Sequence, residues 1–387
     1  MSEAGQLEIQ VCRRVRSALA QAVDETRIAG GVVLVALDGD VITQEAAGFA
    51  NQALAIPMHI DTRFRLASVT KPIVSLAAMK LLEMGVLDLH EPVSHWLPYF
   101  RPSLADGRRP EITLHHLLSH SSGLSYGFQE HPGSEYERFG ISDGLDCSGL
   151  SLEENLRRLA AAKLKFEPGT AWQYSLALDV VGAIIERATG RTLPDAIDAL
   201  ISGPLGLDSL AFIVQSEFEL AVPYVDSLQT LTMMPEPAEV VPPEGPNAIR
   251  FSPCRAHTVG EFPSGGAGMV GAASDILKVL EIVRKKGAGF LDAKLARLMC
   301  SAHVGADLRA QGDGWGFGYM GGVLMAPSVL NTPQRVGTVG WGGVYGHSWF
   351  FDPAAGLTVV SLTNTTWEGV GGRFPQDVRD AVYAALR

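Results

Sequence analysis

Hydrophobic residues recur at helical spacing in several long segments of the chain. Residues 7–28 carry apolar positions among charged ones, which predicts a surface helix near the N-terminus. From Ile73, apolar residues recur three and four positions apart as far as Met84, and Gly85 follows. This second pattern predicts a helix with one buried stripe that ends at the glycine.

Apolar runs bounded by turn residues predict strands near both ends of the chain. Residues 31–37 and 41–43 flank an Asp-Gly turn, which favours a hairpin that we expect at an edge of the sheet. Late in the chain, residues 346–352 and 357–363 form two further runs joined by a short turn. Strands at both ends with helices between them predict one sheet assembled from the two termini.

The middle of the chain is mainly helical in pattern. Helical periodicity is found there in residues 113–120, 152–163 and 178–189. Two later segments, residues 274–285 and 377–386, show the same periodicity. Residues 232–246 are rich in proline, and we expect a long surface loop there. We therefore predict an α/β domain of residues 1–85 and 262–387 and a mainly helical insert domain of residues 86–261.

Composition and charge narrow the possible functions. Hydrophobic residues make up 47% of the 387 residues and charged residues 19%, which is typical of a globular protein. No apolar run reaches the roughly 18 residues of a membrane span, and no secretory signal is visible, so we expect a cytoplasmic protein without a membrane partner. The net charge of −11 argues against nucleic acid and favours a small-molecule partner.

Cysteine and histidine spacing gives no sign of a metal site. Four cysteines lie far apart in the sequence without a C-x-x-C pair, and we expect free thiols: Cys12, Cys147, Cys254 and Cys300. His116 and His120 have the spacing of a zinc-binding helix, but Leu117 stands where the glutamate of H-E-x-x-H would be. We predict structural histidines, and neither a metal nor an organic cofactor.

The segment Ser68-Val69-Thr70-Lys71 lies at the start of the predicted helix from Ile73. Residues three apart on a helix are neighbours, so Ser68 and Lys71 would share one face. A serine hydroxyl needs a base to take its proton, and a lysine serves if burial and the helix dipole favour its neutral form. The pair is a candidate nucleophile and base, although S-x-x-K also occurs by chance in a chain of this length.

Two other segments could complete such a site. Tyr174 follows a turn, and its phenol could act as acid or base beside a cation; a packing role is the alternative. The glycines in Trp341-Gly342-Gly343-Val344 would let the backbone approach a substrate, so that an N–H could bind an oxyanion; a bulge or turn is the alternative.

Two glycine-containing segments have less certain roles. Residues 263–268 either line a site or simply connect two elements, because they lack the spacing of a dinucleotide-binding loop. Residues 123–127 match the G-x-S-x-G elbow of α/β-hydrolases, with Ser125 as the serine. That motif needs a preceding strand, whereas a helical pattern precedes it here, so Ser68 is the better candidate.

Three motifs carry a family resemblance: Ser68-Val69-Thr70-Lys71, Tyr174-Ser175-Leu176 and Trp341-Gly342-Gly343. Their order and spacing resemble the serine β-lactamase and penicillin-binding-protein superfamily, and within it the family VIII carboxylesterases. The resemblance covers about residues 19–386. It implies a β-lactamase/transpeptidase-like α/β (α+β) fold, with an antiparallel sheet flanked by helices, an inserted mainly helical domain and an active site in the cleft between them.

The resemblance also implies roles for single residues. Ser68 would be the acylated nucleophile, and Lys71 and Tyr174 would share proton transfer, without the sequence deciding which is the general base. The backbone N–H groups of Ser68 and Val344 would form the oxyanion hole. The implied substrate contacts are Trp341, Gly342, Gly343 and Leu176.

Two departures from the β-lactamase motifs favour ester substrates. Leu176 replaces the asparagine of Y-x-N, and Trp341 replaces the lysine of K-T-G that meets the β-lactam carboxylate. Losing a cation and gaining an aromatic ring should favour neutral, apolar groups. We therefore predict a serine carboxylesterase that hydrolyses short-chain esters through an acyl-enzyme on Ser68, with weak or no β-lactamase activity. The alternatives are a β-lactamase, a D-amino-acid peptidase or amidase, an acyltransferase and, less favoured, a non-catalytic ligand-binding protein.

Overall fold

The computed structural model of the chain describes residues 3–216, 220–227, 230–243, 245–305 and 312–386. Its α-helices are α1 (Glu3–Asp24), α2 (Thr70–Glu83), α3 (Val93–Trp96), α4 (Leu114–Leu118), α5 (Glu135–Arg138), α6 (Leu152–Ala161), α7 (Ala177–Thr189), α8 (Leu193–Ile197), α9 (Gly203–Leu205), α10 (Ala273–Arg284), α11 (Ala293–Cys300), α12 (Pro327–Leu330), α13 (Thr366–Val370) and α14 (Arg373–Ala385). Shorter helical turns of other types are η1 (Ala67–Val69), η2 (Gly127–Gln129), η3 (Asp198–Ser202) and η5 (Pro253–His257).

The strands form one large sheet and three small ones. The strands are β1 (Gly30–Leu37), β2 (Asp40–Asn51), β3 (Ile56–Pro57), β4 (Phe64–Arg65), β5 (Tyr224–Ser227), β6 (Thr230–Met233), β7 (Ala238–Val240), β8 (Ile249–Phe251), β9 (Val270–Gly271), β10 (Trp315–Phe317), β11 (Gly322–Leu324), β12 (Val339–Gly343), β13 (His347–Asp352) and β14 (Leu357–Thr363). The eight-stranded sheet has the order β10-β11-β12-β13-β14-β1-β2-β3, and its neighbours pair antiparallel.

The two chain ends meet inside this sheet, as predicted. β1 pairs with β14 from Gly31 opposite Thr363 to Leu37 opposite Leu357. The expectation that the first hairpin forms a sheet edge is wrong, because β14 covers the free side of β1 and the edges are β3 and β10. The continuous apolar run of β1 fits this interior position, since both faces of the strand are buried.

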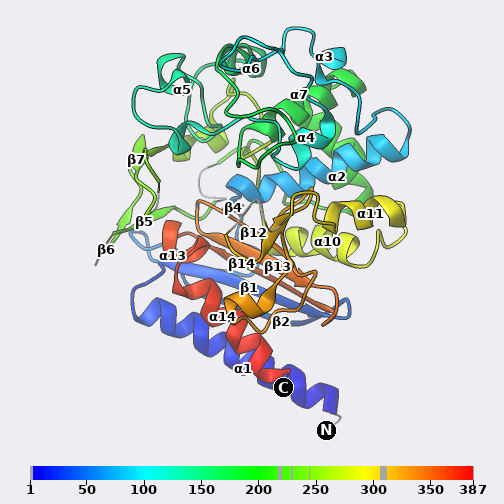
Figure 1. Cartoon of the computed structure of the whole chain (residues 1–387). Coiled ribbons are helices and arrows are strands. Elements are labelled where there is room, and N and C mark those ends of the chain that lie inside the picture. The colour runs from blue at the N-terminus through cyan, green and yellow to red at the C-terminus, as the bar shows by residue number, and fades with distance from the viewer. Residues whose placement is uncertain (1–2, 217–219, 228–229, 244, 306–311, 387) are drawn as a thin grey trace.

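Helices cover both faces of the sheet (Figure 1). On one face, α1 and α14 pack against Val33 and Val35 of β1 and against Val359 of β14. The side chains of Val32 and Leu34, which alternate with these along β1, belong to the large core that includes α2 and α10. The helical part of the molecule lies beyond α2, so this helix stands between the sheet and the helical part (Figure 1).

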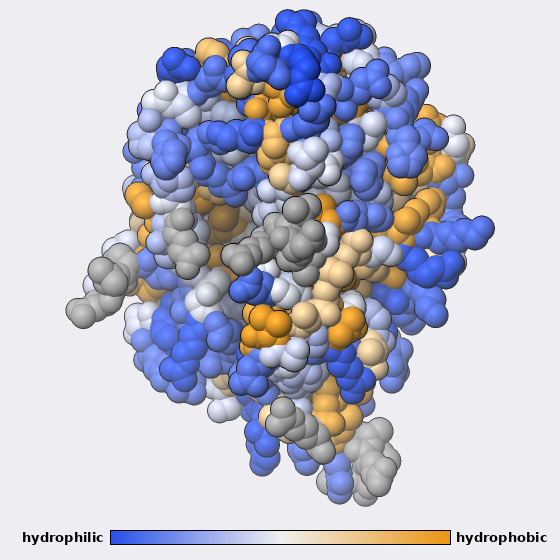
Figure 2. Space-filling view, in the orientation of Figure 1, coloured by the Kyte–Doolittle hydropathy of each residue, from blue (hydrophilic) through white to orange (hydrophobic). Residues whose placement is uncertain are grey.

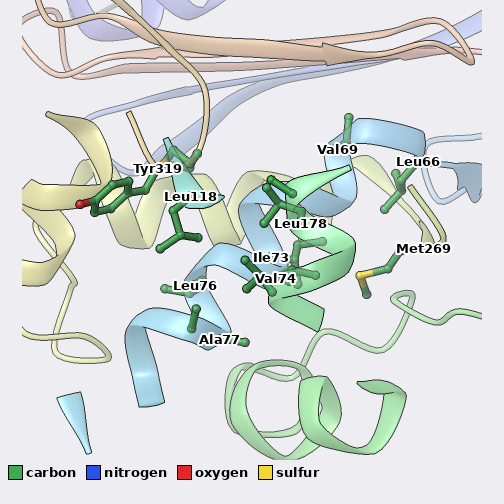
Figure 3. Close-up of a cluster of buried hydrophobic side chains, with 14 of the residues drawn as sticks. Leu66, Val69, Ile73, Val74, Leu76, Ala77, Leu118, Leu178, Met269 and Tyr319 are labelled. Carbon is green, nitrogen blue, oxygen red and sulfur yellow. The ribbon is translucent and has the colours of Figure 1, made fainter. Parts of the chain in front are cut away.

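Helix α2 is buried almost all round rather than along one stripe. Every residue from Thr70 to Met79 is buried, and Leu81 follows, so the predicted single buried stripe is wrong. The physical reason is its central position, because α2 contacts α7 and α8 as well as α10 and α11; Figure 3 shows Leu178 of α7 beside Ile73. The predicted end is confirmed, because Met84 caps α2 and Gly85, the next residue, adopts φ +68°.

The proline-rich segment 232–246 contains regular structure that its sequence did not predict. β5 pairs with β6, and β7 pairs with β8, in two short hairpins that overlap this segment. In β7 the buried and exposed positions alternate over three residues. A segment of three residues is too short for its alternation to predict a strand from the sequence. Glu244 lies outside the described residues.

The domain division stays a prediction, although the helices expected in the middle of the chain are present as α4, α6 and α7. No helix in the described ranges is long and apolar enough to cross a membrane.

Candidate active site

Ser68 lies in a tight helical turn that leads into α2. Ala67, directly before it, has φ +44°, an unfavourable conformation for a residue with a side chain. The turn is held in place because Leu66 N–H donates to the carbonyl of Met269 at 2.8 Å, and Val69 N–H donates to Leu66 at 3.0 Å. The buried turn therefore fixes the direction of the Ser68 side chain.

The structure brings Ser68, Lys71 and Tyr174 together. Lys71 Nζ lies 3.0 Å from Ser68 Oγ, and the Tyr174 hydroxyl lies 2.6 Å from the same oxygen. Lys71 also donates to the carbonyl of Gly266 at 2.8 Å, and Trp341 Nε1 donates to the Tyr174 hydroxyl at 3.2 Å. The glycine-rich segment 263–268, left open by the sequence, therefore lines this site.

Burial makes Lys71 an unusual lysine. The residue is 3% exposed, and burial lowers the pKa of its amine to about 7, while the charge of Asp179 opposes this shift. The two groups flank Gly266, since a β-carbon added there would lie 3.7 Å from Lys71 Nζ and 3.6 Å from Asp179 Oδ2. A neutral amine is therefore available near neutral pH, which is the form that accepts a proton.

Sequence reasoning missed Asp179. This carboxylate is fully buried on α7, where its Oδ1 accepts hydrogen bonds from Ser264 Oγ at 2.7 Å and from Gly266 N–H at 3.1 Å. Its Oδ2 has no hydrogen-bond partner in the described part of the chain, and burial raises the pKa of the carboxyl. The available signal was a single charge among the apolar residues that begin this helix.

Tyr174 remains a phenol at neutral pH. Burial raises its pKa, although its hydrogen bonds with Ser68 and Trp341 act in the opposite direction. His120 lies against its ring, with centroids 4.8 Å apart, and accepts a hydrogen bond from Ser175 N–H at Nδ1 over 3.2 Å. Burial lowers the pKa of His120, so this histidine is neutral and positions the tyrosine segment, in line with the structural role predicted for it.

The segment Trp341 to Val344 lies beside the turn that carries Ser68. A β-carbon added at Gly343 would lie 2.5 Å from the carbonyl oxygen of Leu66, so only glycine allows this approach of β12. Within the described residues, neither the N–H of Ser68 nor that of Val344 donates to another protein group. Both residues line one cavity, as an oxyanion hole requires.

The cavity at Ser68 has a volume of about 350 Å³ and an aromatic wall. Its lining includes Phe128, Tyr174, Trp315, Trp341, Gly342 and Val344, and it continues along β13, β14 and α14 to Phe350, Val359 and Val378. Figure 2 shows a hollow with a hydrophobic floor at the level where α2 begins in Figure 1. Aromatic walls favour an apolar ligand with few polar contacts.

Two sequence candidates lie away from this cavity. Leu176 is fully buried in the hydrophobic core and is not among the residues that line the cavity in the described structure, so its contact with substrate stays a prediction. Ser125 is buried and donates its hydroxyl to the carbonyl of Tyr126 at 3.3 Å, which agrees with the preference for Ser68. Among the described residues, no group of three or more His, Cys, Asp or Glu side chains is arranged to hold a metal ion.

The sequence is similar to known proteins over nearly its whole length. The family model described as Beta-lactamase matches residues 15–381. The chain is 50% identical to Esterase EstB of Burkholderia gladioli, over 96% of this chain and 95% of that protein. It is 28% identical to the ML-236A carboxylate methylbutanoyltransferase mlcH of Penicillium citrinum, over 91% of this chain and 89% of that protein.

Solved structures agree with the sequence relatives. EstCE1, described as a hydrolase with promiscuous acyltransferase activity, superposes with a TM-score of 0.95 at 46% identity and covers 97% of this chain and 99% of its own. The predicted fold class and the resemblance to β-lactamase-like esterases are thereby confirmed. The chain belongs to the β-lactamase family.

Proposed function

We propose that the protein is a serine carboxylesterase that hydrolyses short-chain carboxylic esters through an acyl-enzyme on Ser68. The observation that carries this proposal is the position of Ser68 Oγ, within hydrogen-bonding distance of both the Lys71 amine and the Tyr174 phenol. The 50% identity to a protein named as an esterase, over nearly the whole chain, supports the ester as the bond that is cleaved.

Each residue has a defined task in this mechanism. Neutral Lys71 takes the hydroxyl proton of Ser68, while its own N–H still donates to Gly266. Ser68 Oγ attacks the ester carbonyl, and the N–H groups of Ser68 and Val344 stabilise the oxyanion. The tetrahedral intermediate collapses as Tyr174 gives a proton to the departing alcohol oxygen and regains one from the Lys71 ammonium.

The second half of the reaction returns the enzyme to its starting state. A water molecule loses a proton to the same amine and attacks the acyl carbonyl. The bond between the acyl carbon and Ser68 Oγ then breaks, and Oγ takes a proton back from the Lys71 ammonium. The raised pKa of Tyr174 suits the donor role, because the phenol keeps its proton at neutral pH. The lowered pKa of Lys71 suits the base role.

Trp341 supports ester over β-lactam substrates. In the motif, Trp341 takes the position of the K-T-G lysine of related β-lactamases, and its indole N–H donates to the Tyr174 hydroxyl. A carboxylate would therefore enter an aromatic environment without a counter-charge from this position. A neutral acyl or alcohol group would instead bury apolar surface against the ring.

The test compares two bond types on the purified protein. Initial rates are measured on p-nitrophenyl acetate, p-nitrophenyl butyrate and a chromogenic cephalosporin. We expect both esters to exceed the cephalosporin in kcat/KM by about 100-fold or more, because a buried, unpaired carboxylate weakens binding in the transition state. Cephalosporin opening as fast as ester cleavage would overturn the proposed specificity.

Acyl transfer to an alcohol is the second candidate. The structure described as a hydrolase with promiscuous acyltransferase activity is 46% identical to this chain. The aromatic cavity wall favours an apolar alcohol over water as the group that accepts the acyl chain from Ser68. Formation of an alkyl ester in the presence of an added alcohol, at the expense of free acid, would distinguish transfer from hydrolysis.

The ionisation of Lys71 predicts the pH dependence of the reaction. Because the neutral amine is the active form, kcat/KM should rise with pH through about 7 and then level off. The Asp179 charge raises the pKa of Lys71, so Asp179→Asn should move this rise to lower pH. An asparagine Oδ1 can still accept the hydrogen bonds from Ser264 and Gly266, so the local geometry is kept.

Glu186→Gln provides the matched control for this prediction. Glu186 lies on the same helix as Asp179, but it accepts its hydrogen bond from Leu193 N–H rather than facing Gly266. This variant should leave the pH profile unmoved. A profile of Asp179→Asn that stays in place, or moves to higher pH, would contradict the electrostatic role of the carboxylate.

A further inference from the structure

Two cysteines that are far apart in the sequence meet in the fold. Cys147 Sγ and Cys254 Sγ lie 3.6 Å apart, although 107 positions separate them in the chain. Cys147 is exposed on the loop before α6, and Cys254 is partly buried in η5. The distance corresponds to van der Waals contact between two thiols, whereas a disulfide bond is about 2.0 Å long.

The contact is held by the structure around it. Arg255, next to Cys254, donates to the carbonyl of Asp146 at 2.6 Å and to Glu261 at 3.0 Å. Glu261 in turn accepts the N–H of Ser148 at 3.1 Å. The Arg255 and Glu261 side chains are each 9% exposed, so the residues on both sides of Cys147 are attached to a buried ion pair.

Both segments also pair directly through their backbones. Ser252 N–H donates to the carbonyl of Leu145 at 2.9 Å, two residues before each cysteine. The two chain segments therefore approach each other in a fixed register, and closing the gap between the sulfur atoms requires mainly side-chain rotation.

We propose that Cys147 and Cys254 form a reversible intramolecular disulfide when the protein meets a small-molecule disulfide such as oxidised glutathione. The structure represents the reduced state of this pair. The proposal concerns a modification site outside the Ser68 cavity and does not depend on which ester the enzyme cleaves, because neither cysteine lines that cavity.

The order of steps follows from the exposure of the two thiols. Cys147 is the accessible one, so its thiolate attacks the small-molecule disulfide, forms a mixed disulfide and releases one thiolate. Cys254 then loses its proton, attacks the Cys147 sulfur and releases the second small thiol. Two protein thiols are oxidised and one small disulfide is reduced to two thiols. The pKa of Cys254 is raised to about 11 by burial, which fits its role as the second, intramolecular attacker.

The disulfide would stiffen the support of the catalytic turn. Leu145 packs with Ala67, the residue before Ser68, in one buried cluster that also contains Phe251 and Tyr345. A bond across a loop of this length restricts the unfolded chain, so we expect the oxidised protein to melt about 5 °C higher than the reduced protein. The rate of ester cleavage at moderate temperature should change less than twofold, since the folded geometry already matches the bonded register.

The experiment uses the full chain equilibrated in glutathione buffers of graded redox potential. Thiols that remain are alkylated, and peptide mapping with intact mass identifies the linkage. The proposal predicts loss of two thiols per chain, one linked peptide containing Cys147 and Cys254, and the higher melting temperature, all reversed by excess reduced glutathione. Cys147→Ser should abolish the linked peptide and the melting shift, whereas Cys12→Ser, at a partly exposed cysteine outside the pair, should leave both intact.

Three results would overturn the proposal. The first is that both thiols stay reduced in the most oxidising glutathione buffer. The second is that intact mass shows only separate glutathione adducts on the two cysteines. The third is that a non-reducing gel shows only dimers linked between chains. If Cys147→Ser melts far below the reduced wild-type protein, Cys254→Ser replaces it as the test variant, because either serine removes the bond.

Discussion

Ser68→Ala should lower the kcat/KM of ester hydrolysis by about 10⁴-fold or more, to the level of binding and oxyanion stabilisation alone. The hydroxyl removed is hydrogen-bonded to both Lys71 and Tyr174. No other serine on the described chain shares these two partners. Initial rates on p-nitrophenyl butyrate, with enzyme concentration set by absorbance, measure the loss.

Ser125→Ala is the matched control for this substitution. Its hydroxyl is buried and bonded to the backbone, and it belongs to a sequence that resembles a different hydrolase motif. We expect this variant to keep most of its activity and Ser68→Ala to keep the melting temperature of the wild type within a few degrees. A Ser68→Ala protein that still turns over ester at more than a tenth of the wild-type rate would refute the assignment of the nucleophile.

Much of the fold could be predicted because its elements are coded locally. The hairpin of β1 and β2 has its Asp-Gly turn, and β13 and β14 are apolar runs of strand length. Position within the sheet is not local information, since the place of β1 between β14 and β2 depends on pairing across more than three hundred residues. For the same reason the burial of α2 on all sides could not be read from its own sequence.

The candidate site also has a part that follows from local sequence and a part that depends on the fold. Ser68 and Lys71 are three residues apart on one helix turn, so their proximity follows from helix geometry. Tyr174 and Trp341 were found through motifs that a family shares, because no local rule brings them to Ser68. Asp179 has no such motif, and for the segment that contains Gly266 the sequence left open whether it lines a site or connects two elements. The fold decides both cases by placing Asp179 and Gly266 beside Lys71.

The burial that lowers the pKa of the Lys71 amine also reduces the stability of the folded state. In the folded protein the charged form of this amine is disfavoured, and its pKa is lowered to about 7. The folded state therefore loses stability as the pH falls toward 7. Between that value and the ordinary value of a lysine, the unfolded chain binds more protons, and this one group makes stability rise with pH. The protonation state of Lys71 therefore links the proposed base function to the stability of the fold.

Lys71→Met should reduce kcat/KM on ester substrates by about 10³-fold, because general-base assistance is lost while the length of the side chain is kept. The remaining rate should also lose its rise through pH 7, since that rise belongs to the amine. Lys71→Arg tests the alternative that a positive charge alone is needed. A guanidinium stays protonated and cannot act as base, so the arginine variant should be as impaired as the methionine variant.

Tyr174→Phe separates the two proton-transfer groups. Its hydroxyl donates to Ser68 and accepts from Trp341, and its raised pKa is consistent with the proposed acid role. The loss of this hydroxyl should therefore slow the departure of poor alcohol leaving groups most. Activated p-nitrophenyl esters need little help at that step and should be affected much less than alkyl esters. Lys71→Met should impair both kinds of ester alike. If Lys71→Met retained the pH-dependent rise while Tyr174→Phe lost it, the tyrosine and not the lysine would be the base that activates Ser68.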